Sequence, residues 1–262
     1  MMTNSTNATR ANHEVAHGKM LAEGNPEALW GWGTPAGQRR ARRRADLIAR
    51  GAKLAPGLRV LEIGCGTGMF TEMFAQTGAR VDALDISPEL IELAKRRLPA
   101  NQVCFRVGRF EEENRERKYD AVIGSSVLHH LDLPDALAQA YRLLKPGGLF
   151  AFAEPNLLNP QIFLERTLRF LPFYSYVSPD ETAFVRWRLR ACLEANGFVD
   201  VAVSPFDWLH PRTPKPLIGL VGAAGWLLER CPGLREFSGS LWIRGRRPGP
   251  SALEKTPIQA AA

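Results

Sequence analysis

A glycine-rich run and an isolated acid are the residues of this 262-residue chain best suited to hold a ligand. The run Val-Leu-Glu-Ile-Gly-Cys-Gly-Thr-Gly occupies residues 60–68, and Asp85 follows seventeen residues after Gly68. An apolar segment that ends in closely spaced glycines is typical of a strand that turns sharply and lets its backbone approach a ligand. An acid about twenty residues on, at the tip of the next strand, can hold both hydroxyls of an adenosine ribose.

Glu62, two residues before the first glycine of the run, narrows the class of ligand. A dinucleotide site needs room for a pyrophosphate at a helix N-terminus, whereas an acid beside the loop suits a cationic ligand. An exposed acid at the end of a strand is the structural alternative. We expect Gly64, Gly66 and Gly68 to admit the backbone and Cys65 to contribute its amide.

The run at residues 60–68 closely resembles the first motif of class I S-adenosylmethionine-dependent methyltransferases, and of the small-molecule methyltransferases of types 11 and 12 in particular. The resemblance continues through Tyr119–Ile123, similar to the family's fourth strand, Ser125–Leu131, similar to the segment after it, and Leu143–Leu149, similar to the turn into strand five. It implies an α/β fold with a doubly wound, mostly parallel, Rossmann-like sheet of seven strands. It also implies S-adenosylmethionine as cofactor, but it gives almost no information about the acceptor.

The resemblance also assigns roles at the cofactor. Glu62 would accept a hydrogen bond from the methionine ammonium, directly or through water, Asp85 would hold the ribose, and Ile86 would pack on the adenine. Many relatives carry Gly-Asp at the tip of strand three, where this chain has Gly108-Arg109-Phe110, so backbone groups or stacking by Arg109 or Phe110 would replace that acid. The expected cofactor-binding residues are Glu62, Gly64, Cys65, Gly66, Gly68, Asp85, Ile86, Gly108, Arg109, Phe110 and Ser125.

Two adjacent histidines are the candidate catalytic residues. The segment Ser125–His130 falls where the donor sulfonium would point in a protein of this family. Many enzymes that methylate nucleobase or peptide amide nitrogens carry Asn/Asp-Pro-Pro-aromatic there, and this chain does not. An imidazole titrates near neutrality, so His129 or His130 is the candidate general base for a hydroxyl or thiol, a structural role being the alternative. No histidine and acid spacing indicates a metal site.

Residues 28–37 concentrate aromatic side chains and glycines before an arginine-rich helix expected at 38–51. We expect this segment to close over the cofactor, with Trp30 and Trp32 in the wall of the acceptor pocket. An arginine from residues 39–44 could bind the cofactor carboxylate through two parallel hydrogen bonds. The alternative is a hydrophobic contact that only holds the helix on the core.

The elements that must position these residues follow from the alternation of strand and helix patterns. Strands are expected at 58–63, 80–84, 102–107, 119–123, 149–153, 198–203 and 239–244, and helices at 68–77, 88–98, 134–144 and 180–195. Strands separated by helices predict right-handed crossovers and a parallel sheet. Ligands then gather at the carboxyl ends of the strands, where Gly64, Asp85, Gly108 and Ser125 fall.

We divide the chain into an N-terminal cap at 1–50, a methyltransferase domain at 51–247 and a flexible tail at 248–262. Residues 1–24 are expected to be mobile apart from a helical patch at 13–21. Two apolar insertions, 155–179 and 204–238, are expected to form a roof over the acceptor. Phe173, Tyr176 and His210 join Trp30 and Trp32 as expected acceptor-binding residues, a structural turn being the alternative for His210.

Within the second insertion, residues 216–228 carry no charge and are too few to cross a bilayer as a helix. Burial in the core is the favoured interpretation of this stretch. The charged residues that flank this stretch would also suit a peripheral contact with a membrane surface, which is the alternative interpretation.

The net charge of +7 is concentrated in the arginines of residues 39–44 and 244–247. A solvated helix face and a basic tail explain most of it, so we expect no nucleic-acid partner, while an anionic lipid or acceptor stays open. The four cysteines form no C-x-x-C pair and the N-terminus lacks the apolar stretch of a signal peptide, which predicts a cytoplasmic protein. The oligomeric state is left open.

The predicted function is transfer of a methyl group from S-adenosylmethionine to an oxygen, sulfur or nitrogen of a small, hydrophobic acceptor. Such a transfer needs mainly alignment, so catalysis would come largely from positioning. The arginine cluster suggests RNA or protein methylation as an alternative, and a non-catalytic cofactor-binding scaffold is a third hypothesis. A dinucleotide oxidoreductase shares the glycines and the acid, but the motifs of strands four and five do not support it.

Overall fold

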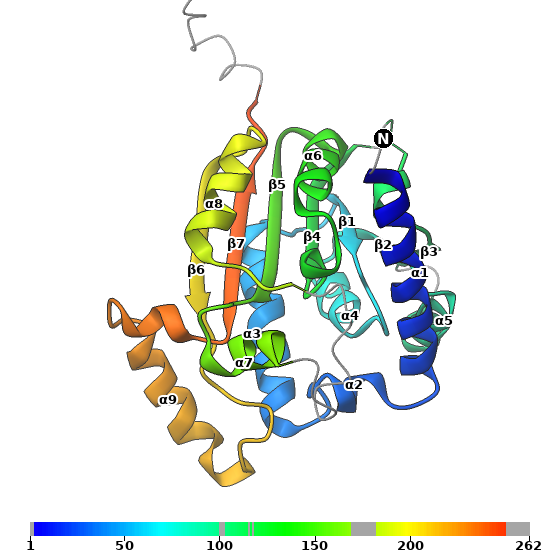
Figure 1. The fold of residues 1–262 in the computed structure, drawn as a ribbon. Coiled ribbons are helices and arrows are strands. Elements are labelled where there is room, and N and C mark those ends of the chain that lie inside the picture. The colour runs from blue at the N-terminus through cyan, green and yellow to red at the C-terminus, as the bar shows by residue number, and fades with distance from the viewer. Residues whose placement is uncertain (1–2, 100–102, 115, 117, 169–181, 250–262) are drawn as a thin grey trace, which may run out of the picture.

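The computed structural model describes residues 3–99, 103–114, 116, 118–168 and 182–249, which contain a single seven-stranded sheet with helices on both faces (Figure 1). The strand order is β3-β2-β1-β4-β5-β7-β6, and only β7 runs antiparallel to its neighbours. The strands are β1 Arg59–Ile63, β2 Arg80–Asp85, β3 Val103–Val107, β4 Tyr119–Ser125, β5 Leu144–Pro155, β6 Val199–Phe206 and β7 Ser240–Arg246. The predicted fold class is confirmed.

The central strands are buried on both faces, which explains why they carry continuous apolar runs. On one face, Leu61 and Ile63 of β1 join a core that includes Leu137 and Leu189 from two covering helices, α6 (Leu133–Leu143) and α8 (Arg186–Ala195). On the other face, Val60 packs in a second core beneath α3 (Pro35–Gly51), α4 (Met69–Ala75) and α5 (Pro88–Arg97).

Strand β5 is longer than the expected 149–153 and decides the geometry of the site. It pairs with β7 as far as Pro155, because Leu241 and Ser240 extend the antiparallel ladder past Ala153. The longer ladder makes Glu154 part of the sheet, fully buried beside the end of β4.

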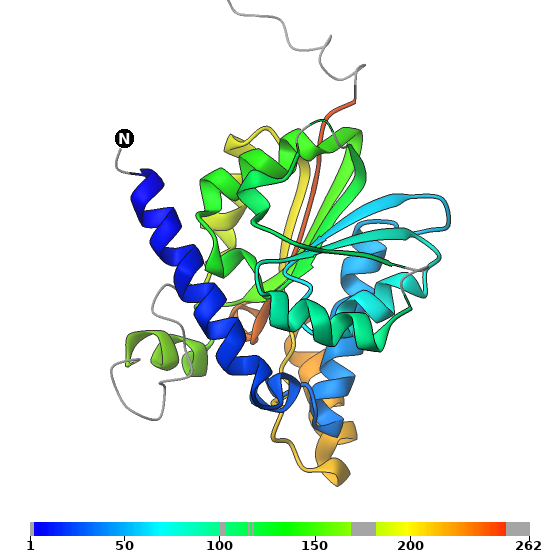
Figure 2. The same ribbon diagram turned by 90° about the vertical axis from the view of Figure 1, so that its right-hand side faces the viewer.

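The N-terminal region is more ordered in secondary structure than its sequence predicted. Residues expected to be mobile outside a short helical patch form helix α1 (Thr3–Ala22), followed by α2 (Pro26–Leu29). Figure 2 shows α1 running along the side of the molecule against α5. The contact is close at Gly18, where an added Cβ would lie 2.6 Å from the Cβ of Ser87.

The two insertions lie at the carboxyl edge of the sheet. The first contains α7 (Pro160–Thr167), while the helix expected from 180 begins only at Arg186, because Phe184 instead pairs with Asn156. The second contains α9 (Ile218–Leu228). Phe173 and Tyr176 fall outside the described residues.

The expectation that residues 216–228 are buried is wrong. Only Ile218 and Gly225 of α9 are buried, whereas Leu220, Trp226 and Leu227 are more than half exposed. The reason is geometric: α9 lies below the carboxyl edge of the sheet (Figure 1), and its side with Ile218 and Gly225 packs on Ala36 of α3 and on the loop after β6. Among the helices that the structure describes, none is long and apolar enough to cross a membrane.

Candidate active site

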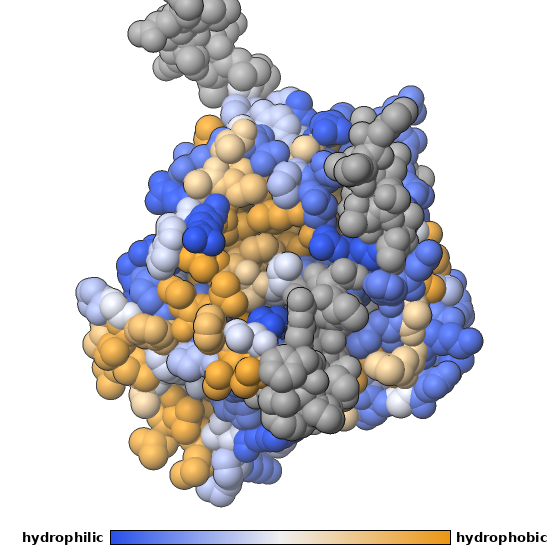
Figure 3. All heavy atoms as spheres, viewed as in Figure 1, coloured by the Kyte–Doolittle hydropathy of each residue, from blue (hydrophilic) through white to orange (hydrophobic). Residues whose placement is uncertain are grey.

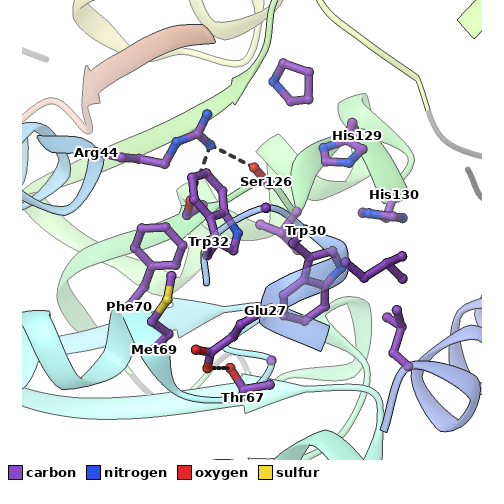
Figure 4. Close-up of a pocket in the computed structure, with 18 of the residues that line it drawn as sticks. Glu27, Trp30, Trp32, Arg44, Thr67, Met69, Phe70, Ser126, His129 and His130 are labelled. Carbon is purple, nitrogen blue, oxygen red and sulfur yellow. Dashed lines mark hydrogen bonds between the residues drawn. The ribbon is translucent and has the colours of Figure 1, made fainter. Parts of the chain in front are cut away.

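A cavity of about 1040 Å³ lies at the carboxyl edge of the sheet, where the strand order reverses between β1 and β4. Such a switch point is the usual ligand site of an open α/β sheet. Figure 4 shows Trp30 and Trp32 projecting into the cavity, opposite His129 and His130. Of the residues predicted from sequence, those that line it are Trp30, Trp32, Gly64, Cys65, Gly66, Asp85, Ile86, Gly108, Arg109, Phe110, Ser125, His129, His130 and His210.

The glycine loop brings its backbone to the cavity by adopting left-handed conformations. Gly64 has φ of 66°, and an added Cβ would lie 2.5 Å from Val127, so any larger residue would collide with the segment after β4. The Cys65 amide donates to the carbonyl of Leu84, so it is already engaged within the protein. Burial raises the pKa of the Cys65 thiol well above its ordinary value, which makes the thiol an unreactive wall group.

Asp85 lies at the tip of β2 with both carboxylate oxygens held by the backbone. Oδ2 accepts from the Gly66 amide at 2.8 Å and Oδ1 from the Ser87 amide at 2.9 Å. Burial raises the pKa of Asp85, and the two amides oppose that rise. Each oxygen of an ionised carboxylate has a further lone pair, so the fixed group can accept from two neighbouring hydroxyls.

Glu62 of β1 is buried just before the glycine loop. Its side chain is 1 % exposed and does not line the cavity, and its Oε2 has no hydrogen-bond partner among the described residues. Burial raises its pKa to about 8, with Thr71 of α4 acting to lower it and the charge of Asp85 to raise it. Glu62 is therefore buried outside the cavity lining, and its raised pKa favours the protonated form at neutral pH.

This raised pKa predicts a pH-dependent stability. An unfolded chain loses the Glu62 proton near pH 4.5, whereas the folded protein keeps it up to about pH 8, so stability falls as pH rises between these values. From about pH 6 to about pH 9, Glu62 should remove roughly 2–3 kcal/mol from the free energy of unfolding. Urea unfolding of Glu62→Gln, which stays neutral, should lack this decline. An unchanged pH dependence in the variant would show that Glu62 is ionised in the folded protein.

Helix α2 is held over the glycine loop by two contacts of its residue Glu27. Glu27 accepts a hydrogen bond from the Thr67 hydroxyl at 2.9 Å and forms an ion pair with Arg97 of α5. Trp30, just after α2, lies against Gly66, where an added Cβ would be 3.4 Å from its ring. The N-terminal segment thus covers the loop, and its aromatic side chains form one wall of the cavity.

Two arginines of α3 reach the cavity, and they differ in their partners. Arg40 pairs with Asp207 at 2.7 Å and lies over the Trp32 ring. Arg44 is only 3 % exposed, and the hydrogen bonds of its guanidinium all go to neutral groups, including Ser126 Oγ at 2.7 Å and the carbonyl of Ala153 at 3.0 Å. Burial and the charge of Arg40 lower the pKa of Arg44 to about 10.

His129 is part of a buried pair with Glu154, which the sequence did not single out. His129 Nδ1 lies 2.7 Å from Glu154 Oε2, while Glu154 Oε1 accepts from the amides of Val127 and Leu128, each at 2.9 Å. Burial acts to raise the pKa of Glu154, but the hydrogen bond and charge of His129, together with these amides, outweigh it and lower the pKa. An ionised Glu154 holds a proton on His129 Nδ1, so the neutral form of His129 would accept a further proton at Nε2.

The two other candidate histidines have different surroundings. His130 Nδ1 lies 3.0 Å from Glu14 of α1, and its ring centroid is 4.2 Å from that of His129. His210 accepts a hydrogen bond from the amide of Arg212, as in a structural turn, although its side chain also lines the cavity. Burial, with the charges of Arg40 and Arg212, lowers the pKa of His210, which favours its neutral form.

Sequence inspection missed Glu27 and Glu154. Both are acids whose partners are distant in the chain, 40 residues away for Thr67 and 25 for His129. The position of Glu154 at the carboxyl end of the strand beside β4 was the signal that could have identified it. The sequence pattern also gave no indication that Arg44, rather than its neighbours, enters the interior.

Comparison with known proteins agrees with this architecture. Residues 61–152 match a family model described as a methyltransferase domain. Ubiquinone biosynthesis O-methyltransferases from Xanthomonas campestris and Xanthomonas oryzae are 35 % and 41 % identical over 178 residues, covering 62 % of this chain and 73 % of theirs. The N-methyltransferase NodS from Bradyrhizobium japonicum, solved with S-adenosylhomocysteine, has the same fold with a TM-score of 0.59 at 18 % identity, covering 90 % of this chain and 99 % of that one.

The sheet order, the glycine loop and the acid after β2 define a methyltransferase fold, and the relatives set the family. The chain belongs to the class I S-adenosylmethionine-dependent methyltransferases. It is an enzyme that uses S-adenosylmethionine to methylate a small molecule, as predicted from the sequence.

Proposed function

We propose that this enzyme is an O-methyltransferase whose acceptor is a hydroxyl group on a hydrophobic, aromatic small molecule. The observation that carries the proposal is the His129–Glu154 pair: an imidazole that lines the cavity, with Nδ1 held 2.7 Å from a buried carboxylate. This arrangement supplies a positioned general base, which a neutral hydroxyl needs more than an amine that already presents a lone pair.

The residues around the cavity fit the cofactor. Asp85 offers two oriented oxygens to the ribose hydroxyls, and Ile86 and Phe110 present apolar surface beside it for the adenine. Arg44, a buried cation whose hydrogen bonds go only to neutral groups, suits a carboxylate. Glu62 does not line the cavity, so it would affect the methionine ammonium indirectly, for example through water, rather than by direct contact.

S-adenosylmethionine supplies an electrophilic methyl carbon attached to a positively charged sulfur. A hydroxyl becomes a stronger nucleophile as its proton leaves, and His129 Nε2 would accept that proton. The imidazolium that forms would be stabilised by Glu154, whose carboxylate is fixed by the amides of Val127 and Leu128. The rest of the barrier reduction would come from alignment inside a cavity that the N-terminal segment covers.

The cavity wall favours an aromatic and apolar acceptor. Trp32 meets Phe70 edge to face with centroids 5.6 Å apart, and Met69 packs in the same cluster. Trp208 and Leu209 of the second insertion complete the wall, so part of the expected roof is supported by the described residues. The relatives named for ubiquinone biosynthesis act by O-methylation, and a substituted phenol is the corresponding acceptor class for this chain.

A set of matched acceptors tests the proposal. Alkyl-substituted phenol, thiophenol and aniline differ only in the nucleophilic atom, and products are identified by mass spectrometry after incubation with enzyme and S-adenosylmethionine. We expect methylation of the phenol, and a higher kcat/KM when an alkyl chain is present. Preferential methylation of the aniline or the thiophenol would contradict an oxygen acceptor, and equal rates for charged and apolar phenols would contradict the apolar pocket.

A further inference from the structure

Helix α9 and the turn after it present an exposed apolar surface with no partner among the described residues. Leu220, Ala223, Ala224 and Leu227 recur at the spacing of one helix face and are exposed, Leu220 by 69 %. Leu217, Trp226, Leu234 and Phe237 extend the same surface and are each between 45 % and 52 % exposed. Figure 3 shows apolar surface gathered in the region of α9 on this face of the molecule. Large exposed apolar surfaces of this kind mark interaction sites.

The charges around this surface are positive. Lys215 and Arg230 are exposed at the two ends of α9, and Arg39 of α3 packs over its middle, where an added Cβ on Gly222 would lie 3.1 Å from Arg39 Nη2. The nearby acids are neutralised: Glu229 pairs with Arg43, and Glu236 with Arg186. The surface is therefore apolar at its centre and cationic at its rim.

We propose that α9 binds the surface of a membrane containing anionic lipid, lying in the interface with its Leu220–Leu227 face in the lipid. α9 itself carries no charge, and its exposed apolar side chains would enter the lipid while Lys215 and Arg230, just beyond its two ends, are attracted to anionic headgroups. Eleven residues of helix span about 16 Å, too short to cross the hydrocarbon core, so α9 lies on the membrane. Apposing the same face of a second copy would bring cations together without acids to pair them, which argues against self-association.

Helix α9 lies next to the cavity, so binding of α9 to a membrane would affect where the cavity sits. Residues 208–212 lead from β6 toward α9, and all five line the cavity. Trp208 also lies beneath α9, where an added Cβ on Gly225 would be 2.9 Å from its Cβ. Membrane contact through α9 would thus place the cavity beside the lipid. The inference concerns binding to a surface and does not depend on which acceptor atom is methylated.

Vesicle flotation tests the proposal with two matched tryptophans. Trp226 on α9 and Trp187 on α8 are 52 % and 53 % exposed, so serine at either position removes a similar apolar surface. Full-length protein should float with vesicles of phosphatidylcholine and phosphatidylglycerol, less with phosphatidylcholine alone, and less at high salt. Trp226→Ser and Leu220→Ser should each weaken binding about tenfold, Lys215→Ala about fivefold on anionic vesicles only, and Trp187→Ser should have no effect.

Two controls keep the outcome decisive. Melting temperature and S-adenosylhomocysteine binding show that each variant is folded, and light scattering reports oligomeric state without vesicles. Absence of flotation in the parent protein, or equal losses for Trp226→Ser and Trp187→Ser, would overturn the proposal. It would also be overturned if the parent were an oligomer that Leu220→Ser converts to a monomer, since the surface would then be covered by a second copy.

Discussion

Replacement of His129 by alanine is expected to lower kcat by about 10²–10⁴-fold, the usual contribution of a positioned general base. The affinity for S-adenosylhomocysteine should change only a few-fold, because the nucleoside part of the site is built from the loop at 64–68 and Asp85. Single-turnover rates with a phenolic acceptor measure the first quantity, and calorimetric titration measures the second.

His130→Ala is the matched control, because the His130 ring lies at a tilt beside that of His129 but its Nδ1 faces Glu14 of α1 rather than Glu154. It should lose no more than a few-fold in rate. Glu154→Gln tests the positioning of the base: kcat should fall by at least about tenfold with little change in KM, and Glu154→Asp should recover part of the loss. Full activity in His129→Ala, with an intact fold, would leave proximity as the mechanism. Unfolding of both His129→Ala and Glu154→Gln would indicate that the pair is structural.

Asp85→Ala is expected to weaken binding of S-adenosylmethionine and S-adenosylhomocysteine by roughly 10²–10⁴-fold. Two hydrogen bonds from hydroxyls to a charged acceptor contribute about 1.5–3 kcal/mol each, and both would be lost. Part of the effect would pass through the loop, because Asp85 also accepts from the amides of Gly66 and Ser87.

Asp85→Asn separates these contributions, since it keeps one acceptor oxygen and the shape of the side chain. It should bind more tightly than Asp85→Ala and less tightly than the parent. NAD serves as the negative control in the same calorimetric experiment, because no pyrophosphate site is expected. Undiminished cofactor affinity in a folded Asp85→Ala would contradict the ribose assignment.

Short local patterns in the sequence were sufficient to predict most of the fold. The glycine run, the acid after the second strand and the turn before strand five are short, contiguous signals, because each reflects the chemistry of one turn. They identified the strands within a few residues and placed Asp85 at a strand tip. They failed at the carboxyl end of β5, which depends on pairing with β7 more than eighty residues away.

The surroundings of the buried polar groups could not be obtained in the same way. The sequence named His129 but not Glu154, and an arginine cluster but not Arg44, because these residues depend on contacts between segments that are distant in the chain. Glu62 shows the converse: the motif identified it in the sequence, but its burial and its absence from the cavity lining became apparent only in the tertiary structure.

Helix α9 shows most clearly what the sequence determined and what the tertiary structure determined. The sequence by itself determined that residues 216–228 are apolar, helical in length and too short to span a bilayer. Composition measures only the tendency of these side chains to leave water, and burial in the core would satisfy it as well as contact with lipid. The tertiary structure decided between the two: α3 and the loop after β6 cover only the side of α9 that carries Ile218 and Gly225, so its apolar face remains exposed.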